Sequence, residues 1–181
     1  MAADITILLG PPGAGKSLQA NILAKKINAI HISTGQIIRE SLNSDPEIAR
    51  VLAKGELVDS EIIERLLQIS LDKIDPEKPI LLDGFPRRKD ETEWLDQYSK
   101  SSTRNIRKVI LIKITENESK KRIISRKRDT NDTVEVVSKR WREYLSDIAY
   151  VIKHYQEKGI FLEVDGMGNP KEIAIRISTN L

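Results

Sequence analysis

The strongest constraint on the fold lies near the start of the chain, where a mostly apolar run leads directly into a glycine-rich loop. The run Ile5–Leu9 is followed by Gly10-Pro-Pro-Gly-Ala-Gly-Lys16-Ser17 and then by an amphipathic helical pattern. Strand, loop and helix therefore occur in the order that the pattern Gly-x4-Gly-Lys-Ser/Thr requires. Glycines let consecutive backbone N–H groups turn inward around phosphate oxygens, and the N-terminus of the helix adds partial positive charge. The sequence predicts a phosphate-binding loop in which Lys16 reaches the outer phosphates of a nucleotide.

The rest of the chain alternates between short apolar runs and helix-like segments. The runs are Ile5–Leu9, Ile30–Ser33, Ile80–Asp83, Val109–Ile114 and Ile160–Val164. This alternation predicts an α/β protein with a parallel sheet and helices on both of its faces. The longest expected helix is Thr133–Tyr155, because apolar residues recur there at spacings of three and four. They are Val137, Trp141, Leu145, Ile148 and Ile152.

Composition narrows the chemistry that such a chain can carry out. The 181 residues, 39% of them hydrophobic, suffice for one sizeable core and favour a single domain. The absence of cysteine excludes disulfides, thiol catalysis and cysteine-bound zinc, and only two histidines are present, so any metal should be held by oxygen. The net charge of +3 gives little support for a nucleic-acid or membrane surface. Because Met1 runs almost directly into Ile5–Leu9 and no run could span a bilayer, we expect a cytoplasmic protein.

Asp83 ends one of the expected strands. Ligands of open parallel sheets bind at the carboxyl ends of the strands. A carboxylate there, together with the Ser17 hydroxyl, is the expected partner of hydrated Mg²⁺ on nucleotide phosphates. The alternative is that Asp83 only caps the turn at Gly84. Beside a phosphate loop we favour the metal-binding interpretation.

Arginines are placed in segments that follow the strands or flank the charged segment 126–132. They are Arg39, Arg87, Arg88, Arg122, Arg126, Arg128, Arg140 and Arg142. The paired N–H groups of an arginine guanidinium can bind two phosphate oxygens at once. Phosphoryl transfer depends more on neutralising charge and aligning the reactants than on covalent chemistry by the protein. No base candidate stands out, since we interpret His31 and His154 as packing or surface residues, and a phosphate acceptor needs no base. We expect no role for Arg142.

Five segments of the chain carry a resemblance to a known family. They are Gly10–Gln19, Ile32–Arg39, Gly55–Val58, Leu82–Arg87 and the late Arg140. In this order, and in register over nearly the whole chain, they resemble the adenylate kinase family. The resemblance implies a single domain, 1–181, with a P-loop three-layer sandwich, a five-stranded parallel sheet, a helical arm for the nucleoside monophosphate at about 33–62 and a short lid at about 126–133. It also implies a monomer without the zinc-binding lid insertion of many bacterial relatives.

Functional roles follow from the resemblance position by position. ATP would be bound by Gly10, Gly13, Ala14, Gly15, Lys16, Ser17, Leu18, Arg122 and Arg126. AMP would be bound by Thr34, Gly35, Arg39, Val58, Gly84, Arg87, Glu91 and Arg140. Ser17 and Asp83 would position Mg²⁺. The catalytic charges would be Lys16, Arg87, Arg122, Arg126, Arg128 and Arg140, and the expected products are two ADP.

Four positions depart from the family pattern. Leu18 stands where a threonine is usual, and Gln36 stands where an aspartate orients metal-bound water. Glu91 replaces the glutamine that reads the adenine edge, and a carboxylate accepts hydrogen bonds but cannot donate one to a ring nitrogen. Asp129 stands where the first lid arginine is expected, so Arg128 would take its role.

Three other functions remain open from the sequence. A UMP/CMP kinase or a monophosphate kinase of broader specificity is favoured by Glu91 and disfavoured by Thr34, which UMP/CMP kinases usually replace with alanine. A degenerate nucleotide-binding module is suggested by Leu18 and Gln36 but disfavoured because Lys16 and Asp83 are kept. A P-loop kinase for a sugar acid or shikimate should lack the stretch Asp83–Arg87.

Overall fold

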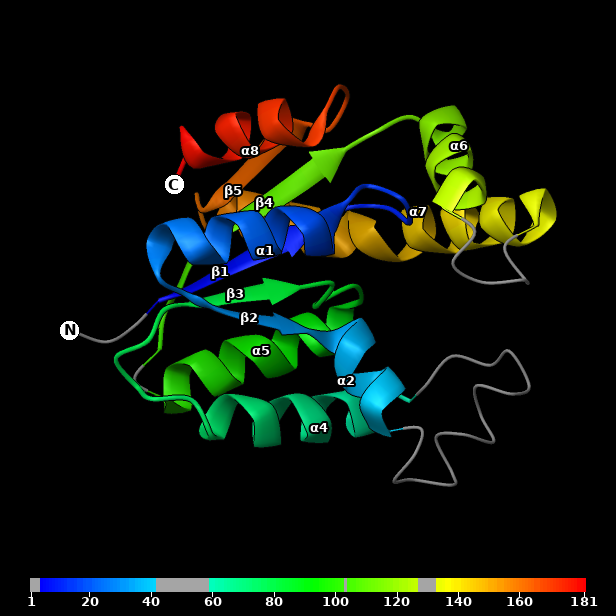
Figure 1. The fold of residues 1–181 in the computed structure, drawn as a ribbon. Coiled ribbons are helices and arrows are strands. Elements are labelled where there is room, and N and C mark those ends of the chain that lie inside the picture. Colours follow the sequence, from blue (N-terminus) through cyan, green and yellow to red (C-terminus); the bar gives the residue numbers. More distant parts are fainter. Residues whose placement is uncertain (1–3, 42–58, 103, 127–132) are drawn as a thin grey trace.

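A five-stranded, all-parallel sheet forms the centre of the molecule (Figure 1). The structure is a computed structural model, and it describes residues 4–41, 59–102, 104–126 and 133–181. The strands lie side by side in the order β2-β3-β1-β4-β5, which confirms the predicted fold class. Their bounds are β1 (Ile5–Leu9), β2 (Ile30–Ser33), β3 (Ile80–Asp83), β4 (Ile106–Lys113) and β5 (Phe161–Asp165).

The first three strands have the bounds that the apolar runs predict. β4 begins at Ile106 rather than at the predicted Val109. Its first residues include Arg107 and Lys108 and lie outside the fully buried stretch, so they carry no apolar signal. The run of apolar residues therefore reports burial, whereas the strand continues as far as backbone pairing with β1 continues.

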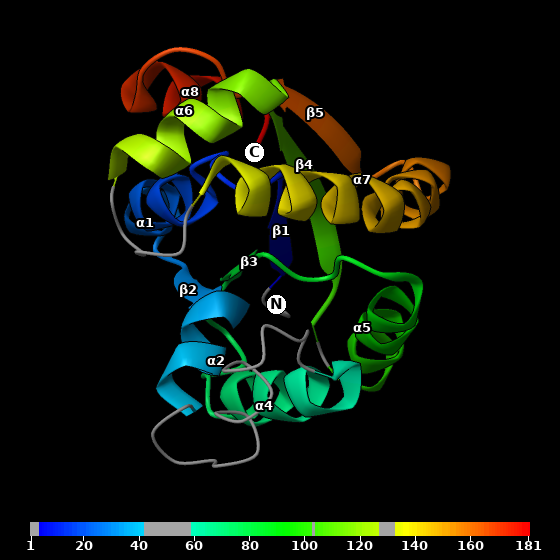
Figure 2. The same ribbon diagram turned by 90° about the vertical axis from the view of Figure 1, so that its right-hand side faces the viewer.

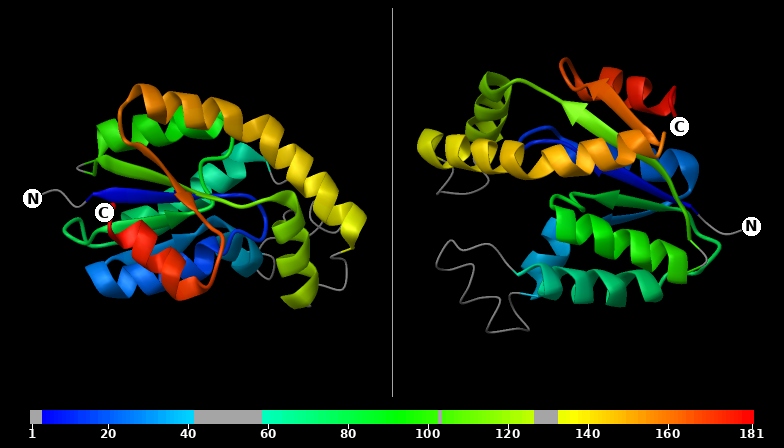
Figure 3. Two further views of the ribbon diagram at one scale, coloured as in Figure 1. Left: turned by 90° about the horizontal axis from the view of Figure 1, so that it is seen from above. Right: turned by 180° about the vertical axis from the view of Figure 1, so that it is seen from behind.

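Helices cover both faces of the sheet, as Figure 3 shows from above. They are α1 (Lys16–Ile27), α2 (Thr34–Ser41), α4 (Ser60–Asp72), α5 (Lys89–Ser101), α6 (Glu116–Arg126), α7 (Val134–Glu157) and α8 (Pro170–Ser178). Side chains of α1 and α8 pack on one face, and side chains of α4, α5 and α7 pack on the other. This arrangement is the three-layer sandwich that the sequence predicts.

Alternation along β1 produces the two cores. Ile5, Ile7 and Leu9 belong to the core under α4, α5 and α7, whereas Leu8 belongs to the core under α1 and α8. Successive side chains of a strand point to opposite faces, so a central strand must be apolar at nearly every position. Buried helix residues in these cores include Leu67, Leu71, Leu95, Val151 and Tyr155 on the first face and Leu23, Ile173 and Ile177 on the second.

One detail of the predicted long helix is wrong. Val137 and Ile148 are buried as expected, but Leu145 is 52% exposed and Tyr144 packs against the core in its place. A step of four residues turns a helix by about 40° beyond a full circle. Two such steps from Val137 carry Leu145 off the buried face, so the stripe continues through Tyr144.

The carboxyl ends of all five strands lie on one edge of the sheet. Figure 2 looks onto this edge, with α6 and the first half of α7 on one side and α2 and α4 on the other. The loop that follows β1 lies between them. Among the described residues, no helix has the length and apolar character needed to cross a membrane.

Candidate active site

Glycines set the conformation of the loop between β1 and α1, and α6 packs against this loop. Gly13 has φ +78°, and a Cβ added there would lie 3.0 Å from the Ser119 carbonyl oxygen. The Ser119 hydroxyl donates to the Pro12 carbonyl at 2.7 Å. Glycine is therefore required both for the left-handed backbone and for the close approach of α6.

Lys16 is the first residue of α1, and its side chain turns back over the loop. Its ammonium group donates to the carbonyl oxygens of Gly10 at 2.8 Å and Pro11 at 3.2 Å. The preceding Gly15 has the left-handed conformation and caps the helix. The loop thus carries the positive end of a helix and a lysine ammonium at one place, an arrangement that suits polyphosphate.

Asp83 joins the loop to the end of β3. Its Oδ2 accepts a 2.5 Å hydrogen bond from the Ser17 hydroxyl and lies 3.5 Å from His31 Nε2. Burial alone would raise the pKa of the Asp83 carboxyl, but the His31 imidazole, the Lys16 charge and the Ser17 hydroxyl outweigh burial and hold that pKa below its usual range. Asp83 is therefore an ionised carboxylate at neutral pH, at the position predicted for metal binding.

The residues after Asp83 form a second part of the site together with α2. The Thr34 hydroxyl donates to the Asp83 carbonyl at 3.3 Å, and Arg87 Nε donates to the Gly84 carbonyl at 2.8 Å. Gly84 has φ +84°, and an added Cβ would lie 3.1 Å from the Arg87 guanidinium and 3.3 Å from the Thr34 hydroxyl. The structure thus brings Thr34, Gly84 and Arg87 together beside Asp83.

Arg39 extends this second part along α2. A Cβ added at Gly35 would lie 3.3 Å from a guanidinium nitrogen of Arg39. Arg39 and Arg87 are both exposed, so their charges face solvent at the same edge of the sheet. Gln36, one of the departures from the family pattern, is also exposed and donates to Glu40 at 2.7 Å.

Glu91 is only 3% exposed, at the start of α5. Its Oε2 accepts from the backbone N–H of Arg87 at 2.6 Å, and its Oε1 lies 3.5 Å from a guanidinium nitrogen of Arg88. Buried carboxylates are stable only when paired and hydrogen-bonded. Both carboxylate oxygens of Glu91 are paired in this way, by Arg87 and Arg88, which directly precede α5.

The arginines of α6 and α7 lie on the opposite side of the loop. Arg122 donates to Glu118 at 2.7 Å and to the Gly166 carbonyl at 2.9 Å, which places it at the turn after β5. Arg126 is the last residue of α6, and Arg140 is exposed on α7. Val58 and Arg128, together with most of the proposed lid and residues 42–58 of the proposed arm, lie outside the described residues.

Reasoning from the sequence missed one site neighbour, His31, and gave no specific role to another, Arg88. His31 was interpreted as a packing or surface residue, but it contacts Asp83. Ser33 of β2 pairs with Asp83 of β3, and His31, two residues before Ser33, points to the same face of the sheet. This contact can be predicted only when β2 and β3 are known to be neighbours. Arg88 contacts Ser60 across a gap of 28 residues, and its position beside Arg87 was the only signal in the sequence.

Comparisons with known proteins agree with this geometry. The family model described as adenylate kinase matches residues 8–160. An adenylate kinase of Prochlorococcus marinus (strain MIT 9211) is 36% identical, over 97% of this chain and 95% of its own length. Adenylate kinase 1 of Nostoc sp. (strain PCC 7120) is 31% identical, over 97% of each chain, and an adenylate kinase of Petrotoga mobilis is 29% identical, over 92% of each. This chain belongs to the adenylate kinase family.

Proposed function

We propose that this protein reversibly transfers the γ-phosphoryl group of MgATP to AMP and forms two ADP. The observation that carries the proposal is the meeting of two binding regions at Asp83 and Gly84. The Asp83 carboxylate is bonded to Ser17 of the phosphate loop, whereas the Asp83 carbonyl is bonded to Thr34 on the other side. A donor on the loop and an acceptor beside Thr34 would therefore lie next to each other.

The donor would be bound on the loop side. The backbone N–H groups of Gly13, Ala14 and Gly15 and the ammonium of Lys16 would hold its phosphates. Arg122 and Arg126 would contact the nucleotide from α6. The contact between Ser119 and Pro12 supports this assignment, because it fixes the distance between α6 and the loop.

The residues present fit a magnesium ion carried by the donor. Mg²⁺ prefers oxygen ligands and keeps several waters, so it needs few protein groups. The Ser17 hydroxyl and the Asp83 carboxylate provide two adjacent oxygens beside the loop, and the lowered pKa keeps Asp83 ionised. Such an ion would neutralise negative charge on the β- and γ-phosphates.

The acceptor would be bound on the other side. Arg39 and Arg87 would hold the AMP phosphate, with Thr34, Gly35 and Gly84 forming the surface beneath it. An AMP phosphate oxygen is already ionised at neutral pH, so it can attack the γ-phosphorus of ATP without a general base. The new bond joins this oxygen to the γ-phosphorus, while the bond from the γ-phosphorus to its bridging oxygen breaks and leaves ADP. Arg140 would contact the transferred group from α7.

Closure would exclude water, which competes with AMP as an acceptor. We propose that the arm at about 33–62 and the lid at about 126–133 close over the two nucleotides, as parts of a single domain, 1–181. We also propose that the protein acts as a cytoplasmic monomer.

The proposal is tested by a coupled assay for ADP formation with MgATP and AMP, GMP, CMP or UMP in parallel. AMP-selective turnover is the expected result. A preference for CMP or UMP would show that the protein catalyses the same phosphoryl transfer to a different acceptor. ATP binding without turnover on any of the four acceptors would contradict the proposal and indicate a nucleotide-binding module.

A further inference from the structure

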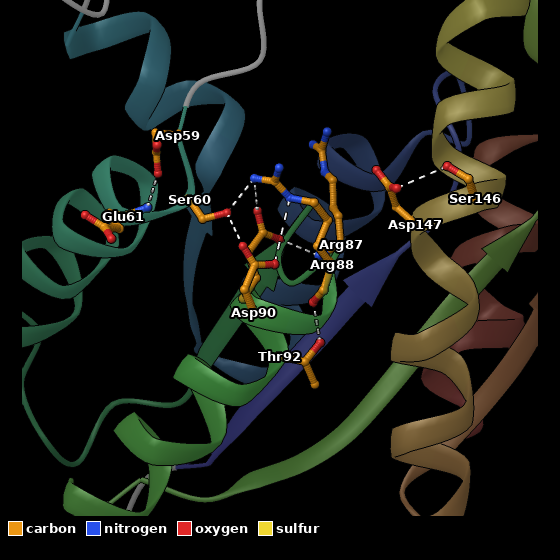
Figure 4. Close-up of polar contacts among 10 residues, drawn as sticks. Asp59, Ser60, Glu61, Arg87, Arg88, Asp90, Thr92, Ser146 and Asp147 are labelled. Carbon is orange, nitrogen blue, oxygen red and sulfur yellow. Dashed lines mark hydrogen bonds and ion pairs between the residues drawn. The ribbon is translucent and has the colours of Figure 1, made fainter.

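Arg88 has no role in the site as proposed, although it directly follows Arg87. The two side chains diverge (Figure 4). Arg87 donates to the Gly84 carbonyl, beside the phosphate side of the site. Arg88 turns toward α4, where it donates to the Ser60 hydroxyl at 2.5 Å and lies 3.5 Å from Glu91 Oε1. Arg88 thus places a cation between the starts of α4 and α5.

The contact between Arg88 and Glu91 changes what the buried carboxylate can recognise. Glu91 Oε2 accepts a 2.6 Å hydrogen bond from the backbone N–H of Arg87, whereas Oε1 makes a longer contact, 3.5 Å, with Arg88, so Oε1 keeps the capacity to accept a further hydrogen bond from a ligand. A carboxylate oxygen can only accept hydrogen bonds, whereas a guanidinium can only donate them. Glu91 Oε1 and the Arg88 guanidinium therefore present an acceptor and a donor side by side.

The surroundings of Arg88 favour a neutral ligand group. Arg88 lines a groove of about 640 Å³ between α4 and α5. Five carboxylates share the lining: Asp59, Glu61, Glu64, Asp90 and Glu93. Such a concentration of negative charge repels a phosphate group but not an uncharged base. A nucleotide whose phosphate is held by Arg87 would therefore turn its base toward this side.

We propose that Arg88 and Glu91 together read the base of the acceptor nucleotide. Glu91 Oε1 accepts a hydrogen bond from an exocyclic amino group, and an Arg88 N–H donates to the adjacent unprotonated ring nitrogen. Adenine presents this pair of groups at N6 and N1, whereas guanine presents a carbonyl and an N–H in the reverse order. The proposal rests on the acceptor site described under Proposed function. It makes Arg88 a specificity-determining residue that supplies the donor Glu91 lacks.

The test compares AMP with 1-deaza-AMP, in which a C–H replaces the ring nitrogen N1. The intact enzyme should prefer AMP by about ten- to a hundredfold in kcat/KM, the ratio expected for one hydrogen bond to a charged donor. Arg88→Met should lower kcat/KM for AMP by a similar factor and leave that for 1-deaza-AMP nearly unchanged. Its activity with GMP relative to AMP should rise, because a carboxylate alone suits the two N–H donors of guanine.

Two controls separate recognition from structure. Lys89→Met removes the next cation along the chain, whose side chain is 65% exposed, and should leave the preference for AMP unchanged. Arg88 also links α4 to α5, so Arg88→Lys, which keeps a cation there, is measured alongside Arg88→Met. Equal losses for AMP and 1-deaza-AMP in Arg88→Met, restored together for both nucleotides in Arg88→Lys, would overturn the proposal and leave Arg88 a purely structural role.

The wild-type enzyme provides an independent test. Equal kcat/KM for AMP and 1-deaza-AMP would overturn the role of Arg88 while leaving the proposed function intact. Failure of the wild-type enzyme to use AMP at all would instead contradict the proposed function. The two failures are therefore distinguishable.

Discussion

The two sides of the candidate site are built in different ways. The donor side, residues 10–17, is one continuous segment whose shape is set by glycines, by the start of α1 and by the packing of α6. The acceptor side combines α2, the start of α4 and the segment Gly84–Glu91, so its contacts join residues far apart in the sequence, such as Ser60 and Arg88. Local sequence determines the first region, whereas the second depends on how distant elements pack.

The two sides also differ in charge. Lys16 lies over the phosphate loop, where the N-terminus of α1 adds positive potential. The acceptor side has arginines next to a group of carboxylates, with Arg88 between Asp90 and Glu91. A charge on the donor side should therefore act mainly on the phosphoryl group, whereas charges on the acceptor side also affect stability and specificity.

The largest effect is expected from Lys16→Met on the donor side. Loss of the ammonium removes a positive charge that the proposed function places on the outer phosphates of the donor, so kcat should fall about a thousandfold in both directions of the reaction. Steady-state kinetics with MgATP and AMP, and with ADP alone, measure the loss. The matched control is Lys25→Met, an exposed lysine in the last turn of the same helix. Unchanged turnover in Lys16→Met would show that the loop is not part of the catalytic site.

The contrast between the two sides explains what could be predicted from the sequence. The strand–loop–helix order at residues 5–27 and the bounds of β1, β2 and β3 were predicted correctly, because each is a short contiguous signal. The contact between His31 and Asp83 was not predicted, because it depends on β2 lying next to β3. The exposure of Leu145 was missed because steps of four residues drift around a helix.

A single substitution at Gly84 can test whether the acceptor side is as tightly packed as its contacts indicate. Gly84→Ala places a Cβ against Arg87 and Thr34 and also forces a left-handed backbone, at φ +84°, on a residue with a side chain. The strain should lower the free energy of unfolding by about 1–2 kcal/mol. Displacement of Arg87 should raise KM for AMP about tenfold while KM for ATP stays unchanged. Urea denaturation and two-substrate kinetics measure the two effects.

Gly159→Ala is the matched control for this substitution. Gly159 also has a left-handed backbone, at φ +69°, but a Cβ added there meets no atom within 4 Å. It should lose similar stability and keep the KM for AMP of the wild type. A tenfold rise in the KM for AMP in both variants would assign the effect to general destabilisation. An unchanged KM for AMP in both variants would show that Gly84 does not contribute to acceptor binding.

The smallest expected effect concerns the carboxylates beside Arg88. Burial, followed by the charges of Asp90, Glu91, Glu61 and Asp59, raises the pKa of Glu64 to about 7. Between the unfolded pKa of about 4.3 and this value the folded state binds more protons than the unfolded state, so stability falls as pH rises. Glu64→Gln should leave stability unchanged at pH 4. At pH 8 it should raise stability by up to about 1 kcal/mol, since solvent screens a half-buried group.

Urea denaturation at both pH values, with and without added salt, measures the effect of Glu64→Gln. Salt should shrink the gain, because part of the raised pKa comes from repulsion between carboxylates that solvent reaches. Glu77→Gln, at an exposed position before β3, removes the same charge away from the groove and should leave the pH dependence as it is in the wild type. A gain at pH 8 in both variants would trace the effect to net charge. A gain confined to Glu64→Gln would show that the acceptor side, unlike the donor side, maintains its charge arrangement at a cost in stability.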